Sequence, residues 1–368
     1  MPHQTRRAPR TLKTLGALTT LGALIALGAL SALLPLAAHA ASFDCAKAKS
    51  PSEKLICSDA ALGALDERLA AAYKSLVAQL TEAEKKQLKE TQRSWLKSWP
   101  LLCSATPSAK QPTLGAGALP CAKARYEERL GDLKTSKGFA GGRLLVYTHA
   151  LYSAIPVTEM DTPPVSEEGA QLFFARHTLR SARVSEAGLS GDDLALVKAA
   201  NAWLAPTASE LSALKSDSSE TTTTLTLTGP TPALWCASVS TQGMEFGAAH
   251  ENNFSEDRWF WVAQRRPLVA ADVFGVKGWQ KTLAQLAFGA LKASIPDDLD
   301  VEGAQVESFV TLVSSPARWS FTREGLELNF NAYDVASYAA GPQSVVVPWA
   351  PLEALLTPSF KEARKGLR

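Results

Sequence analysis

Histidine is scarce in this chain: five of 368 residues are histidine, and only His149, His177 and His250 follow residue 40. Histidine is the commonest metal ligand and the side chain best suited to proton transfer near neutral pH. No His-Glu-x-x-His segment is present either. We therefore expect no metal site, no cofactor and no histidine-based catalysis.

An excess of charge of one sign is also missing, with 38 Lys and Arg against 36 Asp and Glu. Nucleic-acid-binding domains carry a marked basic excess, and disordered acidic tails carry the opposite excess. Neither class fits, so we expect no nucleic-acid partner. The length predicts roughly two domains.

Long apolar runs are absent except near the N-terminus. Residues 1–13 hold four basic side chains and no acid, Leu15–Leu36 has no charge, and Ala38 and Ala40 occupy the positions that a signal peptidase inspects. This order predicts a signal peptide over residues 1–40 and a periplasmic or secreted protein with no membrane span after cleavage. An uncleaved membrane anchor is the alternative, because the apolar run is longer than in most signal peptides.

The charge that remains after residue 40 is unevenly divided. The segment 41–137 carries 16 basic and 11 acidic residues, a net charge of +5, whereas 138–368 carries 18 and 25, a net charge of −7. An acidic exported region attracts basic partners at low ionic strength.

The segment 42–137 has the pattern of a small helical domain. Leucines and a tyrosine from Leu62 to Leu80 recur at three- and four-residue steps, which is typical of an amphipathic helix. Thr81 and Glu84 form a capping-box pattern that predicts the start of a second helix, and we expect Pro100 to end it. A third helix is expected from about Cys121 to Leu133, followed by a glycine-rich boundary at Gly138–Gly142.

The pattern changes after residue 143 to short strands and fewer helices. This predicts an α+β fold, with one antiparallel sheet covered by helices. We place an unassigned α+β segment at 140–220 and a second α+β domain at 220–358. Trp259 and Trp261 share a strand face and are expected in the core. The expected strands are Leu144–Tyr147, Thr221–Thr228, Leu234–Ser240, Arg258–Val262, Trp319–Thr322, Leu326–Phe330 and Val345–Val347, and the main expected helices are Asp192–Leu204 and Trp279–Leu291.

Four of the five cysteines lie in the helical segment: Cys45, Cys57, Cys103 and Cys121. In an oxidising compartment they suit two disulfides, for which three pairings exist, and pairing of near neighbours is favoured because each bridge then closes a short loop. Zinc is the alternative, although the spacings contain no Cys-x-x-Cys. Cys236 is left over and is expected to be a buried small apolar residue rather than a reactive thiol.

Several motifs recur in order over residues 43–133. They are Phe43-Asp44-Cys45, Glu53-Lys54-Leu55-Ile56-Cys57, Gln92-Arg93-Ser94-Trp95-Leu96 and Tyr126-Glu127-Glu128-Arg129, with Cys103 and Cys121 between the last two. Together they resemble the N-terminal domain of the LprI-type lysozyme inhibitors. The resemblance implies a small exported helical module whose cysteines are paired as disulfides. It does not by itself imply lysozyme inhibition, because the module occurs in many exported bacterial proteins.

A second set of motifs lies within about residues 220–356. They are Gly247–His250, Ala271–Phe274, Phe321–Leu326, Phe330–Gly341 and Val345–Pro348. Together they resemble the extracytoplasmic lysozyme-binding C-terminal domain of anti-sigma factors of the RsiV type. The resemblance implies an α+β domain that contacts a lysozyme. A sigma-regulating role is disfavoured, because the residues before the first apolar run are too few for a sigma-binding domain.

These observations favour a non-catalytic binding protein that inhibits or sequesters lysozyme, a commonly basic enzyme. The first candidate contact is the acidic loop of Asp297, Asp298, Asp300 and Glu302, which would attract a basic partner. A solvated connection between a helix and a strand is the alternative interpretation of that loop.

The rival hypothesis is a peptidoglycan-related enzyme or recognition protein of the cell envelope in which both domains are accessory. It requires a catalytic group in the unassigned segment. The acid–base side chains available there are His149, His177, Asp161, Asp192 and Asp193, whose spacing defines no site.

Overall fold

The structure is a computed structural model that describes residues 41–108, 110, 112–115, 117–139, 143–157, 172–295, 297, 299–301 and 306–367. The predicted signal peptide over residues 1–40 lies outside these residues, and so do Asp161, Asp298 and Glu302. Within the described ranges, no helix combines the length and the apolar character needed to cross a membrane.

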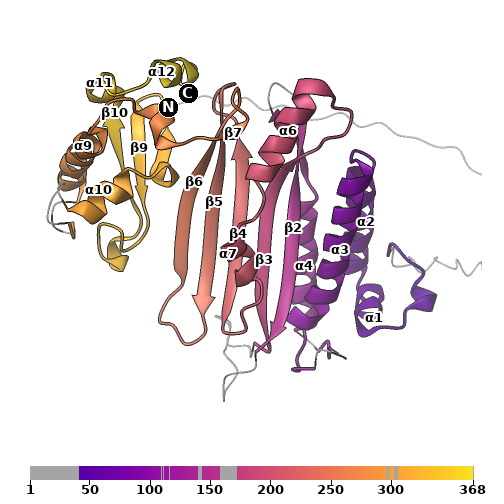
Figure 1. Ribbon diagram of the computed structural model, residues 1–368. Coiled ribbons are helices and arrows are strands. Elements are labelled where there is room, and N and C mark those ends of the chain that lie inside the picture. The colour runs from indigo at the N-terminus through magenta and orange to yellow at the C-terminus, as the bar shows by residue number, and fades with distance from the viewer. Residues whose placement is uncertain are drawn as a thin grey trace, which may run out of the picture. The chain divides into compact units, whose positions relative to one another are not determined.

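Residues 41–133 form the helical module, and its helices begin at side-chain caps except for the last, which follows Gly117. Thr81 and Glu84 form the predicted capping box, in which each side chain bonds the other's backbone N–H. An unexpected short helix begins at a second capping box, made by Ser50 and Glu53. The elements are η1 (Cys45–Lys47), α1 (Pro51–Ser58), α2 (Ala60–Val77), α3 (Glu82–Leu102) and α4 (Ala118–Asp132) (Figure 1).

The prediction that Pro100 ends the second helix was wrong, because α3 continues to Leu102. A proline removes only its own N–H donor and restricts the residue before it. The backbone N–H of Cys103 still donates to the carbonyl oxygen of Trp99 at 3.1 Å, so the last turn closes beyond the proline.

The core of the helical module combines the leucine stripe of α2 with three aromatic rings. The rings of Trp95 and Trp99 lie 4.9 and 5.7 Å from the ring of Tyr126 on α4, both in edge-on geometry. The Tyr126 hydroxyl donates to Asp66 at 3.0 Å, which satisfies its buried polar end. Aromatic packing between α3 and α4 therefore completes this core.

The largest element is a seven-stranded sheet in the order β1 to β7. All neighbouring strands are antiparallel except β3 and β4, which are parallel. A parallel pair needs a crossover connection, and two helices between β3 and β4 supply it. The strands are β1 (Thr135–Gly138), β2 (Leu144–Pro156), β3 (Phe174–Val184), β4 (Ser219–Thr228), β5 (Leu234–Glu245), β6 (Asn252–Trp261) and β7 (Arg266–Pro267), and the helices are α6 (Gly191–Trp203) and α7 (Ala208–Ala213).

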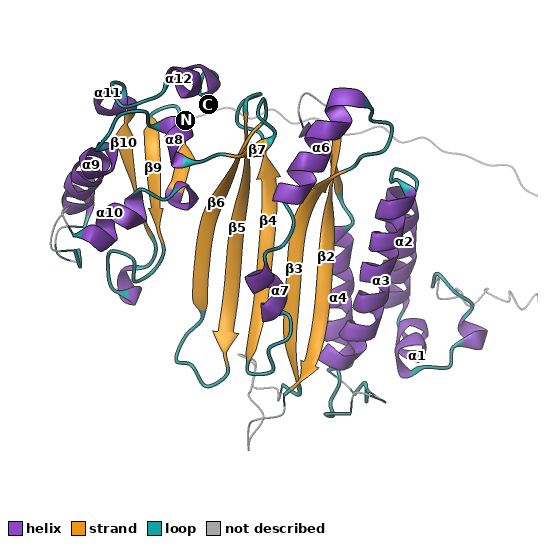
Figure 2. Ribbon diagram, in the orientation of Figure 1, coloured by secondary structure: helices purple, strands orange, loops and turns teal. Residues whose placement is uncertain are grey.

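Helices cover the two faces of this sheet unequally. Both α6 and α7 lie across one face (Figure 2), where Val197, Ala200 and Leu204 pack with Trp235 and Phe260 of the sheet. On the opposite face the helical module contacts only the β2–β3 side, as shown by the bonds from Ser94 to Tyr152 and from Arg180 to Asp132.

The C-terminal part, which follows β7, has its own three-stranded sheet in the order β10-β9-β8. Strands β8 and β9 form a hairpin, and Gly325 permits its close approach to β10, since a Cβ there would lie 2.2 Å from the carbonyl oxygen of Val347. Its elements are α8 (Ala270–Val273), α9 (Trp279–Ser294), α10 (Glu307–Val313), η2 (Pro316–Arg318), β8 (Trp319–Phe321), β9 (Gly325–Phe330), η3 (Tyr338–Ala340), β10 (Gln343–Pro348), α11 (Trp349–Leu352) and α12 (Pro358–Ala363).

An aromatic core joins this second sheet to the end of β6. Trp259 and Trp261 are buried, as predicted, and the Trp259 indole donates to the carbonyl oxygen of Trp319 at 2.7 Å. The α+β class is confirmed, but the sheet is mixed at one pair and a second sheet exists. The seven-stranded sheet takes strands from both sides of the domain boundary that we expected at residue 220. The boundary itself remains a prediction.

Candidate functional site

Two disulfides tie the helical module together: Cys45 with Cys57, and Cys103 with Cys121. This is the near-neighbour pairing, with Cα–Cα distances of 5.7 and 5.6 Å. Cys236 is free and buried. Burial, followed by the nearby charge of Asp257, raises the pKa of its thiol, so the sulfur stays protonated and unreactive, as expected.

The acidic loop is described at two of its four predicted residues, Asp297 and Asp300, and both are exposed. The Asp300 backbone N–H donates to the carbonyl oxygen of Val335 at 2.8 Å, and Leu299 pairs with Ala336 as an isolated β-bridge. The loop is therefore held against the segment that follows β9. Its role in binding remains a prediction.

Tyr333 and Tyr338 of that neighbouring segment form an aromatic cluster with His250, which lies between β5 and β6; Tyr333 is exposed and the other two rings are half-buried. The His250 ring stacks on Tyr338 with centroids 3.7 Å apart, and the Tyr333 ring lies 5.5 Å from the Tyr338 ring. The Tyr338 hydroxyl donates to the carbonyl oxygen of Glu251 at 2.8 Å. The stacking fixes three rings from two distant segments on one surface.

Tyr333 is the most exposed large hydrophobic residue of the described chain, at 64%. Its φ of 70° lies in the left-handed region, which costs about 1–2 kcal/mol for a residue with a Cβ. Polar bonds hold this turn: the Asn331 N–H donates to Asp334 at 2.7 Å, and Arg318 pairs with Asp334 at 2.8 Å. A strained backbone that displays an aromatic side chain points to a binding role.

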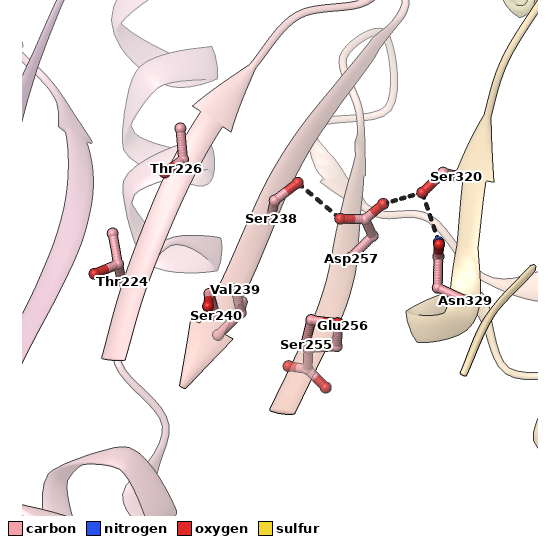
Figure 3. Close-up of a pocket in the computed structure, with 10 residues that line it drawn as sticks. All are labelled: Thr224, Thr226, Ser238, Val239, Ser240, Ser255, Glu256, Asp257, Ser320 and Asn329. Atoms are coloured by element: carbon pink, nitrogen blue, oxygen red, sulfur yellow. Dashed lines mark hydrogen bonds between the residues drawn. The ribbon is translucent and has the colours of Figure 1, made fainter. Parts of the chain in front are cut away.

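A polar cavity of about 330 Å³ lies between the seven-stranded sheet and the hairpin of β8 and β9 (Figure 3). At its centre the Asp257 carboxylate accepts hydrogen bonds from Ser238 at 2.7 Å and from Ser320 at 2.6 Å. Asn329 in turn donates to the Ser320 hydroxyl at 2.8 Å. Three strands therefore position one carboxylate.

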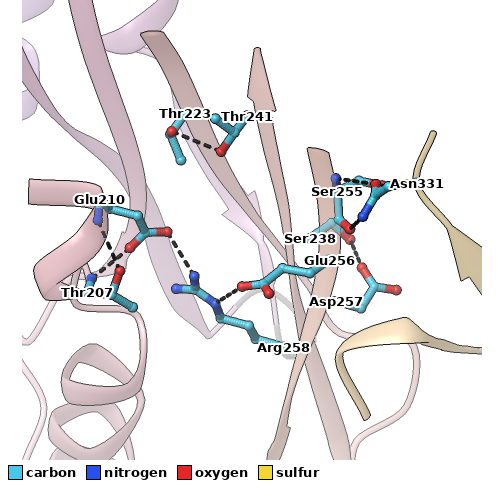
Figure 4. A network of polar contacts seen from close by, with 10 residues as sticks. All are labelled: Thr207, Glu210, Thr223, Ser238, Thr241, Ser255, Glu256, Asp257, Arg258 and Asn331. Carbon is cyan, nitrogen blue, oxygen red and sulfur yellow. Dashed lines mark hydrogen bonds and ion pairs between the residues drawn. The ribbon is translucent and has the colours of Figure 1, made fainter. Parts of the chain in front are cut away.

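The residues that flank Asp257 form an ion-pair network on the other face of the sheet, although Glu256 also contributes to the cavity lining. Arg258 binds Glu256 and also Glu210 of α7, both at 2.8 Å, and so fastens that helix to the strand (Figure 4). Because successive strand residues point to opposite faces, Asp257 is separated from this ion-pair network. The same alternation places Ser255 on the cavity side, where its backbone N–H donates to Asn331 at 2.7 Å.

Two acid–base residues of the rival enzyme hypothesis, His177 and Asp192, make structural contacts. His177 is fully buried and its Nε2 lies 2.7 Å from the carbonyl oxygen of Ser216. Burial lowers the pKa of His149 to about 4. Asp192 pairs with Arg265, and no three His, Cys, Asp or Glu side chains of the described ranges are grouped for a metal ion.

Neither the aromatic cluster nor the Asp257 cavity was predicted as a site. The tyrosines lay within a motif that indicated only family resemblance. The sequence did contain a signal for the cavity. Threonine occupies every second position at Thr222, Thr224, Thr226 and Thr228, and this spacing places four hydroxyls on one face of β4.

Comparison with known proteins finds two different families in separate parts of the chain. Residues 45–133 match the family model described as Lysozyme inhibitor LprI, and residues 271–350 match a family described as Protein of unknown function (DUF3298). The second match covers part of the region that resembles the RsiV-type domain, a resemblance that stays a prediction. Among proteins of curated function, none matches this chain.

Two solved structures of the DUF3298 family resemble the chain. One, from Bacteroides fragilis, is 13% identical and covers 61% of this chain and 98% of its own, with a TM-score of 0.44. The other, from Pseudomonas aeruginosa, is 15% identical and covers 59% of this chain and 95% of its own, with a TM-score of 0.38. At these scores the likeness carries no functional argument.

Proposed function

We propose that this protein is an exported, non-catalytic inhibitor of lysozyme that acts in the periplasm or outside the cell. The observation that carries the proposal is the match of residues 45–133 to the lysozyme inhibitor family, together with the two disulfides of that module. Disulfides persist in oxidising compartments, which supports export.

The charge of residues 138–368 and the surface of the C-terminal part support a basic protein as the partner. Residues 138–368 have a net charge of −7, and the acidic loop lies beside the aromatic cluster through the bond from Asp300 to Val335. Exposed tyrosines are frequent binding hot spots, and neighbouring acids guide a basic partner to them. We assign Tyr333 as the anchor and the acidic loop as the steering group.

Inhibition would then occur by occlusion of the enzyme's cleft. A stable complex buries about 800 Å² on each partner, far more than one loop provides, so residues around the cluster must also contact the enzyme. The stacking of His250 on Tyr338 already orders two of these rings, which lowers the entropy lost on binding.

The deciding experiment is a turbidity assay of cell-wall lysis by several types of lysozyme in the presence of the chain from residue 41 onward. We expect inhibition of at least one type. Substitution Tyr333→Ala should weaken it about 10- to 100-fold, as expected for a hot spot of about 2 kcal/mol. The matched control is Val346→Ala, which truncates another exposed apolar side chain of the same C-terminal part and should leave inhibition unchanged.

The outcomes distinguish an error in the proposed binding surface from an error in the proposed function. Inhibition that survives Tyr333→Ala rejects the aromatic cluster but keeps the inhibitor. No inhibition of any lysozyme, together with release of sugar or acetate from peptidoglycan by the protein alone, rejects the inhibitor and favours the enzyme.

A further inference from the structure

The Asp257 cavity has a floor of aligned hydroxyl groups. Strand register places Thr226 opposite Ser238, and Ser238 opposite Asp257. A second row, two residues along each strand, consists of Thr224, Ser240 and Ser255. Adjacent rows on one face of a sheet form a regular polar surface, and all six residues line the cavity.

Much of the hydrogen-bonding capacity of this floor is unused. Within the described part of the chain, the hydroxyls of Thr224, Thr226 and Ser240 have no hydrogen-bond partner, and Thr226 and Ser240 are exposed. Each hydroxyl can donate once and accept twice. The floor can therefore bond a ligand that carries both donors and acceptors.

Asp257 gives the cavity its charge preference. Among the described residues no Lys, Arg or His forms an ion pair with Asp257, and its carboxylate interacts with the hydroxyls of Ser238 and Ser320 and with the neutral thiol of Cys236. Each carboxylate oxygen keeps a further lone pair that can accept a hydrogen bond. An anionic ligand would meet this uncompensated charge, whereas a neutral ligand rich in hydroxyl donors would satisfy it.

We infer that the Asp257 cavity binds a short neutral saccharide. Its volume of about 330 Å³ is at the lower end of the range for small-molecule sites, about 300–1,000 Å³. No aromatic side chain lines it for stacking against a sugar ring, so binding is weak, with a dissociation constant of about 1 mM. This site goes beyond the proposed inhibition of lysozyme and uses none of the aromatic cluster.

The test is a titration of the full chain, monitored by saturation-transfer NMR, with three disaccharides: cellobiose, N,N′-diacetylchitobiose and the anionic digalacturonate. At least one neutral sugar should bind and digalacturonate should not. Asp257→Asn keeps the shape of the side chain and should weaken binding about tenfold, whereas Thr224→Val removes one hydroxyl and should weaken it about threefold. Thr222→Val is the control, because Thr222 lies on the same strand face outside the cavity lining.

Three results would overturn the inference: no binding of either neutral sugar at about 50 mM by natively folded protein, equal binding of digalacturonate, or binding that both variants leave unchanged. If Asp257→Asn fails to fold, as judged by circular dichroism, Thr224→Val decides alone. Inhibition of lysozyme should be unaffected by Thr224→Val, so the two sites are tested separately.

Discussion

The helical module and the C-terminal part are stabilised in different ways. The module, residues 41–133, has a core of leucines and three aromatic rings, closed by two disulfides. The C-terminal part has no disulfide in its described residues and instead buries an aromatic network in which Trp319 contacts Phe274, Trp279 and Phe321. A small domain with a limited core depends on covalent links, whereas a larger apolar core does not.

The two regions also differ in charge, and this difference suggests separate roles. The net charge is +5 over residues 41–137 and −7 over residues 138–368, so the two parts of the sequence carry opposite net charges. Arg180 of β3 binds Glu128 and Asp132 of α4, so ion pairs fasten the module to the sheet. Beyond residue 138 several acids form internal ion pairs, such as Glu210 with Arg258 and Asp272 with Arg266. Asp297 and Asp300 of the acidic loop are exposed, and such charges attract a basic partner.

The largest expected effect concerns the aromatic core. Trp319→Ala removes a fully buried side chain whose indole donates to the carbonyl oxygen of Val313 at 2.7 Å. The void that the substitution leaves in the core, together with the lost contacts, should reduce the free energy of unfolding by about 3–5 kcal/mol. Urea denaturation measures this, and Val346→Ala on the exposed side of β10 should change it by less than about 0.5 kcal/mol. A loss below about 1 kcal/mol would contradict the central role of Trp319.

Loss of a disulfide should lower the free energy of unfolding slightly less than Trp319→Ala does, and only for the helical module. Replacing Cys103 and Cys121 by serine opens a loop of 18 residues, which should lower stability by about 3 kcal/mol. Non-reducing peptide mapping should find Cys45 bound to Cys57 and Cys236 free. Cys236→Ser is not a neutral control, because it buries a hydroxyl; Cys236→Ala, at about 1 kcal/mol, is the suitable one. A different connectivity would contradict the structure.

Local signals explain which elements could be predicted. The start of α3 depends on Thr81 and Glu84 alone, which are three residues apart, so a capping pattern predicts it. Strand β3 was not expected, because its polar residues His177, Arg180 and Arg183 interrupt the apolar pattern. Those side chains bond Ser216, Asp132 and Asn201, which are distant in sequence. The parallel pairing of β3 with β4 depends on such long-range contacts and has no short-range signal.

The candidate sites, like the strands, could be predicted only where their residues are close in sequence. The acidic loop was predicted because its charges are contiguous in sequence. Asp257 was not, because its partners Ser238 and Ser320 come from other strands, one of them 63 residues away. From the sequence alone, Asp257 cannot be distinguished from an ordinary surface carboxylate of a strand. The strand register distinguishes it, because it places hydroxyl groups on both sides of the carboxylate.

The contact between the helical module and the seven-stranded sheet should be sensitive to acid. Burial, followed by Arg183 and by Arg129 of the module, lowers the pKa of His149 to about 4. The unfolded chain binds this proton below about pH 6.5, whereas the folded chain does not until about pH 4. Stability is therefore fully present above pH 6.5 and is lost as the pH falls toward 4, by about 2–3 kcal/mol at pH 4.5.

Urea denaturation of His149→Gln at pH 7.5 and pH 4.5 measures this contribution. The variant cannot titrate at this position, so its acid-induced loss should be smaller than that of the unmodified chain. His177, whose pKa burial also lowers, and the carboxylates contribute to both proteins and cancel in the comparison. An equal loss in the two proteins would show that His149 is accessible to protons in the folded state.

The smallest expected effect tests whether the charge difference guides binding. Reversing Asp297 and Asp300 to Lys should slow association with a basic lysozyme about three- to tenfold at low salt and change dissociation little, because exposed charges act mainly on the encounter. The matched control reverses Glu67 and Glu90, two exposed acids of the helical module, and changes the net charge by the same amount. Stopped-flow association at rising ionic strength should show the difference vanish as the screening length falls to about 8 Å. Equal slowing by both pairs would mean that only net charge matters. No slowing by either pair would remove the acidic loop from the binding surface and leave Tyr333 as its tested anchor.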